Sequence, residues 1–394
     1  MDHLYETTCP LFGSCGGCRY NGTDYASELK QKEEKIKALF LPLLGEDFFE
    51  SASYEGVIPS PKACAYRNKM EYSFGNAEKD GPLTLGLHQK KSFYNVLSVQ
   101  ECRLVHPDLN TITAAVQAWF REKGADFYHK KTHQGLLRHL ILRRSETNGD
   151  ILVNLVTSGD ARGYEEWTAY LLSLPLSGRI RGILHTENHS LSDAIVPEKV
   201  TLLYGEGFLE ETVLGLHFKL SPFSFFQTNT RAAEKLYEKV REYIALTPGA
   251  VVYDLYSGTG TIAQVLSPAA GRVYGVEIVE EAVAAARENA ALNGLSNCCF
   301  LAGDVLKKLE ELPEPADYIV LDPPRDGVNP KALSKLLRSG ARRMVYVSCK
   351  PSSLARDLPL LRLGGYEAEK MVLADLFPRT DNIECAMQFV RKMS

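Results

Sequence analysis

Short apolar runs alternate with amphipathic stretches in the C-terminal part of the chain. Runs rich in β-branched and aromatic residues stand at 251–256, 272–276, 318–321 and 344–348. Such runs are typical of buried strands, and the segments between them, of which 283–293 is one, have the spacing of helices. Strands that alternate with helices predict an α/β domain, whose ligands bind at the carboxyl ends of the strands.

The N-terminal half has a different pattern. Residues 25–44 have helical periodicity with charges on one face, and Pro42 is expected to end this helix. We interpret the charged face as solvated. Residues 65–75 alternate polar and aromatic residues, as a half-exposed strand does, and their basic and aromatic side chains would suit phosphate contact and base stacking. An ordinary amphipathic strand explains the same pattern.

A strand pair is predicted over residues 133–156, with its turn at Asn148-Gly149. The most basic part of the chain lies in and beside it and contains Lys130, Lys131, Arg138, Arg143 and Arg144. This patch favours contact with RNA, and a charged hairpin edge that resists aggregation is the alternative. A domain boundary is expected near residue 222, before a predicted helix at 230–245.

Length and composition are those of a globular chain with two or three domains. The chain has 394 residues, of which 45% are hydrophobic and 24% are charged. It has no run of about 18 apolar residues and no basic-then-apolar N-terminal pattern, so we expect no membrane partner and a cytoplasmic location. The net charge of −4 gives no global sign of nucleic-acid binding, and a local basic face is compatible with it.

Nine cysteines in a chain without an export signal point to metal binding or catalysis rather than disulfides. Cys9, Cys15 and Cys18 are separated by glycines, so a tight loop can turn their sulfurs toward one centre. An iron–sulfur cluster generally takes four thiolates, and Cys102, or less favourably Cys64, is available as the fourth. A four-thiolate zinc site is the competing interpretation.

A glycine-rich turn, S-G-T-G-T-I-A at 257–263, follows the first strand of the C-terminal part. Glycines at a helix N-terminus let backbone amides approach a ligand, and Glu277 at the end of the next strand would hold ribose hydroxyls. The pattern fits either NAD or S-adenosylmethionine. Asp304 closes a third strand, where it would reach the adenine, and the Asp322-Pro-Pro-Arg325 segment ends a fourth. Hydride transfer has no need for that stiffened loop.

The strand at 344–348 stops at Cys349. A strand end directs this thiol toward a ligand, and Lys350 and Arg356 would favour the thiolate, which is the nucleophilic form. A core cysteine is the alternative interpretation.

Six motifs occur in order along the C-terminal part, and they are SPFSFFQTN, DLYSGTGTIA, YGVEI, LDPPRDG, YVSCKPSSLARDL and DLFPRTDNIE. In this order they resemble the RNA 5-methyluridine methyltransferases. With CPLFGSCGGC, YRNKMEYSFG and LLRHLILRR they are similar to the bacterial 23S rRNA branch that carries a [4Fe–4S] cluster. The resemblance covers nearly the whole chain.

The resemblance implies an α/β fold in three parts. It places an iron–sulfur region at 1–60 with its fourth ligand from 102, and a central α/β RNA-binding domain at 61–222. A Rossmann-like, S-adenosylmethionine-dependent methyltransferase domain with a mixed seven-stranded sheet follows at 223–394. Many members begin with an oligonucleotide-binding TRAM barrel, and because this chain starts almost directly at Cys9, a member without that barrel is expected.

The resemblance also implies roles for single residues. Cys349 matches the nucleophile, and Glu384 matches the general base. The residues matched to cofactor binding are Gln227, Tyr256, Gly258, Thr261, Glu277, Asp304 and Asp322. The cluster ligands by resemblance are Cys9, Cys15, Cys18 and Cys102. The family's FPHTxHxE ending differs here, since Arg379 and Asn382 replace histidines, and Lys350 replaces a common asparagine; these departures bear on binding of the target base.

The implied reaction is methylation of carbon 5 of a uridine in RNA, with 23S rRNA as the expected target and no DNA partner. Addition of a thiolate to carbon 6 turns the ring into an enolate that attacks the sulfonium methyl, and a carboxylate then removes the hydrogen on carbon 5. The alternatives are an RNA-binding or ribosome-assembly factor with little activity, methylation of a uridine in tRNA or of a cytosine, and an NAD-dependent oxidoreductase.

Overall fold

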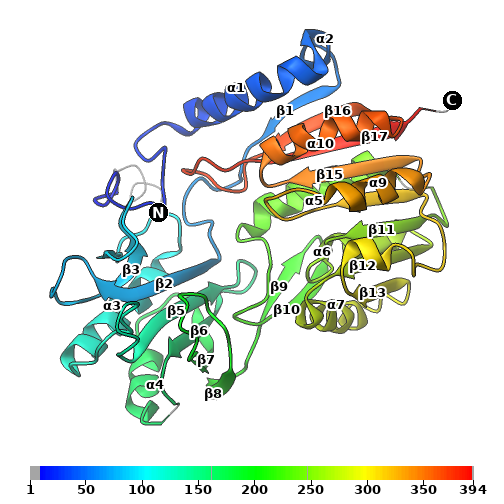
Figure 1. Ribbon diagram of the computed structural model, residues 1–394. Coiled ribbons are helices and arrows are strands. Elements are labelled where there is room, and N and C mark those ends of the chain that lie inside the picture. Colours follow the sequence, from blue (N-terminus) through cyan, green and yellow to red (C-terminus); the bar gives the residue numbers. More distant parts are fainter. Residues whose placement is uncertain (1–8, 161, 246, 393–394) are drawn as a thin grey trace. The chain divides into compact units, whose positions relative to one another are not determined.

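The computed structural model describes residues 9–160, 162–245 and 247–392 (Figure 1). The chain forms two compact units. Unit 1 contains the described residues up to Thr23 together with Lys62–Glu211 and Lys219–Phe223, and unit 2 contains Asp24–Pro61, Thr212–Phe218 and the described residues from Ser224 onward. The sequence grouped residues 1–60 in one region, whereas the structure divides this stretch between the two units.

Unit 2 is built on an eight-stranded mixed sheet in the order β1-β16-β17-β15-β14-β11-β12-β13. Its strands are β1 (Tyr54–Ile58), β11 (Val251–Leu255), β12 (Arg272–Glu277), β13 (Cys298–Ala302), β14 (Tyr318–Leu321), β15 (Arg343–Ser348), β16 (Tyr366–Ala374) and β17 (Glu384–Arg391). Its helices are α1 (Tyr25–Leu44), α2 (Glu46–Glu50), α5 (Thr230–Ile244), α6 (Thr261–Leu266), the 3₁₀ helix η2 (Ser267–Ala269), α7 (Glu280–Leu292), α8 (Val305–Lys308), α9 (Pro330–Arg338) and α10 (Pro351–Leu363).

The predicted seven-stranded sheet corresponds to β11–β17, and the eighth strand comes from the N-terminal part of the chain. β1 pairs in parallel with β16, with Ile58 opposite Ala374. β17 is the antiparallel member, since it runs against both β15 and β16. β11, β14 and β15 are buried along almost their whole length. This burial explains why they read as continuous apolar runs, because parallel strands covered on both faces carry no polar alternation.

Helix α1 has the predicted bounds, and much of its charged face is solvated as predicted, since the Lys30 and Glu34 side chains are 75% and 64% exposed. Ile36 and Phe40 pack into the hydrophobic core of unit 2. Glu28 and Lys32 stand on the same i, i+4 stripe as these two residues, and they are 0% and 1% exposed. Pro42 lies inside the last turn, and Gly45 ends the helix. Helical spacing therefore predicted the element, while the burial of its charges depends on what covers them.

Unit 1 is built on a seven-stranded sheet in the order β4-β3-β2-β5-β6-β7-β8. Its strands are β2 (Lys69–Asn76), β3 (Leu83–His88), β4 (Val96–Ser98), β5 (Leu137–Arg144), β6 (Asp150–Thr157), β7 (Arg179–Glu187) and β8 (Lys199–Gly205). Helices α3 (Pro107–Glu122) and α4 (Glu165–Leu172) contribute the apolar side chains of its core, among them Leu109 and Trp167. The predicted strand pair is confirmed as the antiparallel pair β5–β6.

Parts of the two surfaces that the sequence suggested for RNA are turned inward, whereas Lys131 of the basic patch is exposed. Tyr72 and Phe74 of β2 are 0% and 5% exposed and belong to the core, so they present no face for base stacking. Arg143 is buried as well. Arg138 donates to the carbonyls of Asn188 and Ser190, at 2.9 and 2.6 Å. Arg138 therefore ties β5 to the segment after β7. The pattern along a strand does not show which face the core takes.

The two remaining strands, β9 (Leu209–Val213) and β10 (Leu216–Leu220), pair with one another in a separate two-stranded sheet. Among the described helices, none combines the length and apolar character that crossing a membrane would require.

Candidate active site

Strands β14, β15 and β17 bring three reactive side chains to one edge of the sheet of unit 2. Asp322 follows β14 and Cys349 follows β15, and because these strands are parallel, both residues stand at their carboxyl ends. β17 runs antiparallel to β15 with Cys385 opposite Ser348. Glu384, the first residue of β17, therefore lies at the same end of the sheet as Cys349, which follows β15.

Burial raises the pKa of each of these groups, and neighbouring carboxylates raise it further for Glu384 and Cys349. Burial raises the pKa of Asp322 to about 7. Burial, with Asp322 adding to it, raises the pKa of the 1% exposed Glu384 to about 8. Burial and then Glu384 and Asp322 raise the pKa of the Cys349 thiol to about 11. A cation bound at this edge would favour both the thiolate and the carboxylates.

The cation that already acts on this centre is Arg325, and not the two residues that the sequence suggested. Arg325 lowers the pKa of both Cys349 and Glu384. Lys350 is exposed at the N-cap of α10. Arg356 donates to the carbonyl of Asp326 at 2.8 Å and pairs with the neighbouring Asp357. Proximity in sequence did not predict this cation, because Arg325, whose charge acts on the thiol, lies in the loop after a different strand.

The glycine-rich turn after β11 adopts backbone angles that favour glycine. Gly258 and Gly260 have φ of 52° and 73°, and Tyr256 also has a positive φ of 65°. A Cβ at Gly260 would lie 2.5 Å from the Phe300 ring, so a larger residue does not fit. Asp254 accepts the backbone N–H of Ala263 at 2.9 Å and thereby ties β11 to the first turn of α6.

The residues matched to cofactor binding lie along this same edge of unit 2. Thr261 is the first residue of α6, after the turn with Tyr256 and Gly258. Glu277 ends β12, and its carboxylate accepts the N–H of Gly258 and of Val279, each at 3.0 Å. A carboxylate has further acceptor sites, so these bonds leave capacity for hydroxyl donors.

Two further predicted residues flank this group. Asp304 follows β13 and caps α8, where its carboxylate accepts the N–H of Lys307 at 3.3 Å. Gln227 lies in the segment before α5, and that segment reaches the glycine turn because Thr259 donates to the carbonyl of Phe225 at 3.2 Å. Phe225 itself is 69% exposed.

Three buried polar atoms near the glycine turn have no hydrogen-bond partner among the described residues. They are Asp254 Oδ1, Ser257 Oγ and Thr228 Oγ1. Burying a polar atom without a partner costs free energy, so these atoms suit a ligand with donors and acceptors of its own. The sequence interpretation passed over Asp254, although an acid inside a buried strand just before a glycine turn is a signal that could have found it. Burial raises its pKa to about 7.

A buried ionic network holds the segment between β16 and Glu384. Lys32 Nζ lies 2.8 Å from Glu28 and 2.9 Å from Asp375, and it donates to the carbonyl of Phe377 at 3.2 Å. Glu28 accepts the backbone N–H of Arg379 at 2.6 Å and pairs with its guanidinium at 3.3 Å. Arg379, one of the departures from the family pattern, is therefore an internal partner of α1.

The four cysteines predicted to bind a cluster line one pocket in unit 1. Cys9, Cys15, Cys18 and Cys102 share it with apolar neighbours that include Leu87 and Leu104. Burial and then the neighbouring thiols, Cys102 first among them, raise the pKa of Cys18 to about 12. The Gly17 N–H points at Cys15 Sγ from 3.4 Å.

Among the residues that the structure describes, no group of three or more His, Cys, Asp or Glu side chains is arranged to hold a metal ion.

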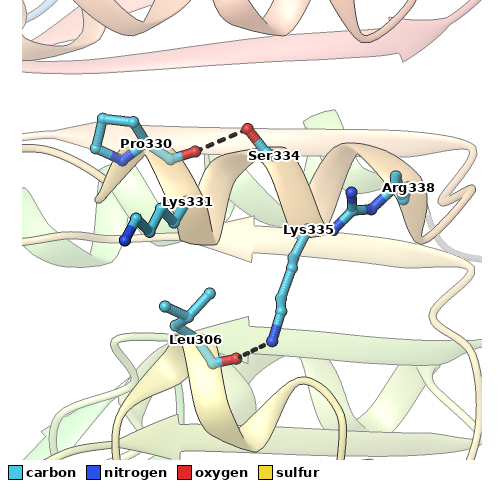
Figure 2. Close-up of a pocket in the computed structure, with 6 residues that line it drawn as sticks. All are labelled: Leu306, Pro330, Lys331, Ser334, Lys335 and Arg338. Atoms are coloured by element: carbon cyan, nitrogen blue, oxygen red, sulfur yellow. Dashed lines mark hydrogen bonds between the residues drawn. The ribbon is translucent and has the colours of Figure 1, made fainter.

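A second pocket lies along one face of α9 and carries none of the predicted site residues (Figure 2). Lys335 donates to the carbonyl of Leu306 at 2.8 Å and also pairs with Glu310. Ser334 donates to the carbonyl of Pro330 at 2.9 Å. The contacts of Lys335 join α9 to α8 and to the residues just after it.

Comparisons with known proteins agree with this arrangement. The family model described as tRNA (uracil-5-)-methyltransferase matches residues 207–392. RNA methyltransferases of uncharacterised function from Caldanaerobacter subterraneus subsp. tengcongensis and Clostridium tetani are each 44% identical to the chain. The first match covers 96% of this chain and 83% of the relative, and the second covers 100% and 85%.

A solved structure is similar over the same extent. The tRNA (uracil-54, C5)-methyltransferase of Pyrococcus abyssi, crystallised with S-adenosyl-L-homocysteine, is 25% identical, with a TM-score of 0.78 over 96% of this chain and 86% of that one. This likeness confirms the predicted α/β methyltransferase fold, and the relatives confirm the prediction of an RNA-methylating enzyme. Because relatives at this identity span nearly the whole chain, the chain belongs to the tRNA (uracil-5-)-methyltransferase family of RNA methyltransferases.

Proposed function

We propose that the chain methylates carbon 5 of a uridine in RNA through a covalent bond between Cys349 and carbon 6 of the base. The observation that carries this proposal is the meeting of Cys349, Glu384, Asp322 and Arg325 at one sheet edge, beside the glycine turn. A thiol and a buried carboxyl at one centre supply a nucleophile and a proton acceptor.

Each step has a residue to perform it. The thiolate of Cys349 bonds to carbon 6, and the electron pair of the 5,6 double bond moves onto the ring as an enolate, which Arg325 is placed to stabilise. Carbon 5 of the enolate would then bond to the methyl carbon of S-adenosyl-L-methionine, whose bond to sulfur would break and leave S-adenosyl-L-homocysteine. Glu384, as carboxylate, removes the proton from carbon 5, and the returning electron pair expels the thiolate of Cys349 and restores the double bond.

S-adenosyl-L-methionine would supply an electrophilic methyl and a positive charge at this edge. The residues fit it in two respects. The turn at Gly258 and Gly260 leads directly into α6, and the unpartnered buried atoms of Asp254, Ser257 and Thr228 can take hydrogen bonds from a ligand. We assign Gln227, Tyr256, Gly258, Thr261, Glu277, Asp304 and Asp322 to its binding. The P. abyssi protein's complex with S-adenosyl-L-homocysteine supports S-adenosyl-L-methionine as the methyl donor.

We further propose that Cys9, Cys15, Cys18 and Cys102 bind a [4Fe–4S] cluster. A [4Fe–4S] cluster takes four thiolates, and these four cysteines line one pocket. Cys64 does not line the pocket, which favours Cys102 as the fourth ligand.

For the RNA target we propose 23S rRNA, on the resemblance of the cysteine-rich segment and the central motifs to that branch. A uridine in tRNA is the second candidate, because the matching family model and the P. abyssi enzyme are both named for tRNA. In either RNA the base must leave its stack to reach Cys349, which favours a loop or single-stranded site.

The first experiment compares the protein with its Cys349→Ala variant on 23S rRNA and on tRNA, each prepared without 5-methyluridine, with S-adenosyl-L-methionine present. We expect the protein to form 5-methyluridine, located by mass spectrometry of RNA fragments. Cys349→Ala should lower the rate to below about a thousandth, since the nucleophile is lost.

The matched control is Cys299→Ala, which removes a half-buried thiol from β13. It should stay active, and both variants should bind S-adenosyl-L-methionine in calorimetry. Full activity of Cys349→Ala would reject the nucleophile, and no methylation of either RNA by the protein would reject the reaction.

A further inference from the structure

Two loops of unit 1 carry exposed aromatic and basic side chains that the proposed chemistry does not use. The first loop, residues 89–95, joins β3 to β4, and the second, residues 128–134, precedes β5. Phe93 is 79% exposed and Tyr94 is 54% exposed. Large aromatic side chains are rarely left this open without a partner to cover them.

Lysines of the second loop lie against the aromatic rings of the first. Lys130 Nζ is 5.7 Å from the centre of the Phe93 ring and donates to the Phe93 carbonyl at 3.3 Å. Lys131 Nζ is 4.7 Å from the centre of the Tyr94 ring. The two loops therefore form one surface, which we call the 93–94 platform, made of Phe93, Tyr94, Lys130 and Lys131.

The charge of this surface is positive. Lys90 and Lys91 add two exposed lysines to the first loop, and neither loop contains an aspartate or glutamate. The acid that reaches the surface is Asp193, which pairs with Lys130 at 2.7 Å. An aromatic face surrounded by lysines suits a ligand with flat apolar groups on an anionic chain.

The first loop is held in shape by its own hydrogen bonds. Asn95 N–H bonds to Ser92 Oγ at 3.0 Å, and the Asn95 amide donates to the Gln89 side chain at 2.9 Å. The cysteine-bearing segment also supports it, because Lys90 N–H bonds to the Ser14 carbonyl at 2.8 Å and Gln89 bridges to Cys15. The rings are thus presented on a fixed turn, which lowers the entropy lost when a ligand binds.

We propose that the 93–94 platform binds a single-stranded segment of the RNA substrate, with bases stacked on Phe93 and Tyr94 and phosphates near Lys90, Lys91 and Lys131. This proposal rests on the proposed function only because it takes RNA as the ligand. Aromatic stacking tolerates any base, so the platform contributes affinity rather than sequence choice. A protein partner is the competing class, and the absence of acids from both loops together with the lysines favours a polyanion.

The test measures binding of a fluorescent single-stranded oligouridylate by anisotropy, with the full chain, at several salt concentrations. Phe93→Ala/Tyr94→Ala should weaken binding at least about tenfold, because each stacked base contributes on that scale. The salt dependence of RNA binding by this double variant should equal that of the wild type. Lys91→Ala should lower the slope of log K against log salt by roughly 1 instead.

Tyr204→Ala is the matched control, since Tyr204 of β8 is an exposed aromatic of the same unit, 42% exposed, outside the two loops. It should bind RNA as the wild type does. Equal affinity of Phe93→Ala/Tyr94→Ala and wild type would overturn the platform and leave a protein partner as the class to pursue. If the double variant loses RNA affinity while the wild type methylates no RNA, the platform stands and the proposed reaction fails.

Discussion

At the scale of single residues, the candidate active site of unit 2 contains Glu384 and Cys349, which are both mainly protonated at neutral pH when no ligand is bound. The pKa of Glu384 is raised to about 8 and that of Cys349 to about 11, and burial is the first cause in each case. The proposed reaction needs both groups without their protons. A positively charged methyl donor would lower both pKa values, so this geometry links activation of the thiol to occupancy of the cofactor site.

Glu384→Gln tests the last step of the proposed reaction. Glutamine cannot take the proton from carbon 5, so elimination should stall after methyl transfer and the bond between Cys349 and the RNA should persist. We expect a slowly migrating protein–RNA complex on a denaturing gel, absent from Cys349→Ala/Glu384→Gln. A Glu384→Gln variant that turns over normally and leaves no such complex would exclude Glu384 as the base.

The same carboxyl predicts how stability depends on pH. The folded pKa of Glu384 is about 8 against 4.5 for the free side chain, so the folded protein holds this proton more tightly. Its stabilising contribution is complete below about pH 4.5 and is lost as the pH rises through 8. Glu384→Gln stays neutral, so relative to wild type its free energy of unfolding should gain roughly 2–4 kcal/mol between pH 5 and pH 9.

Urea unfolding of both proteins at the two pH values measures this difference. If the free energies of unfolding of Glu384→Gln and wild type differ by the same amount at both pH values, Glu384 titrates in the folded protein as it does in the unfolded chain.

At the scale of elements, the amphipathic pattern predicted the positions of helices and strands well. It did not predict which side chains of these elements are buried. The bounds of α1 and β14 match their predicted ranges, because helical periodicity and an apolar run bounded by turn residues are local signals. The burial of Glu28, Lys32 and Arg138 depends on residues outside their own helix or strand. Each is buried by a partner far along the chain, such as Asp375 for Lys32. The i, i+4 spacing of Glu28 and Lys32 with Ile36 and Phe40 indicates their stripe of the helix, but it does not identify these partners.

Lys32→Met tests the network between α1 and the segment that leads to Glu384. Lys32 lies between Glu28 and Asp375, all three at most 1% exposed, so its removal leaves two carboxylates without their cation in a buried space. We expect a loss of about 3–5 kcal/mol in the free energy of unfolding, measured in urea.

Lys30→Met is the matched control on the same helix, since the Lys30 side chain is 75% exposed and lies 3.9 Å from Glu34. It should change stability by less than about 0.5 kcal/mol. Equal effects of the two substitutions would mean that burial of Lys32 contributes nothing specific.

At the scale of the whole molecule, the chain crosses between its units several times, and each unit gathers residues that are distant in sequence. Unit 1 brings Cys102 to the pocket of Cys9, Cys15 and Cys18. Unit 2 joins Asp24–Pro61 to the methyltransferase sheet, where β1 becomes its edge strand. The domain limits predicted at 60 and 222 follow changes of pattern along the chain, whereas the units follow the packing.

The cysteine pocket predicts which thiols bind iron. Cys102→Ala should lose the iron and acid-labile sulfide of anaerobically purified protein, together with its visible absorption, because the fourth thiolate is missing. Cys64→Ala is the control, since Cys64 lies outside the pocket lining and its loss should leave the iron content unchanged. Iron-free wild-type protein, or an equal loss in both variants, would contradict the proposed ligand set.

The sequence by itself determined the kind of fold, the family and the candidates for chemistry, because strand and helix periods, the glycine turn and the order of motifs are properties of neighbouring residues. It did not determine which cation acts on Cys349, which charges of α1 are buried, or where an exposed aromatic surface lies. Those depend on which strands and helices become neighbours and on which face of each meets the core. Only the tertiary structure decides them, since burial and charge act through distances in space.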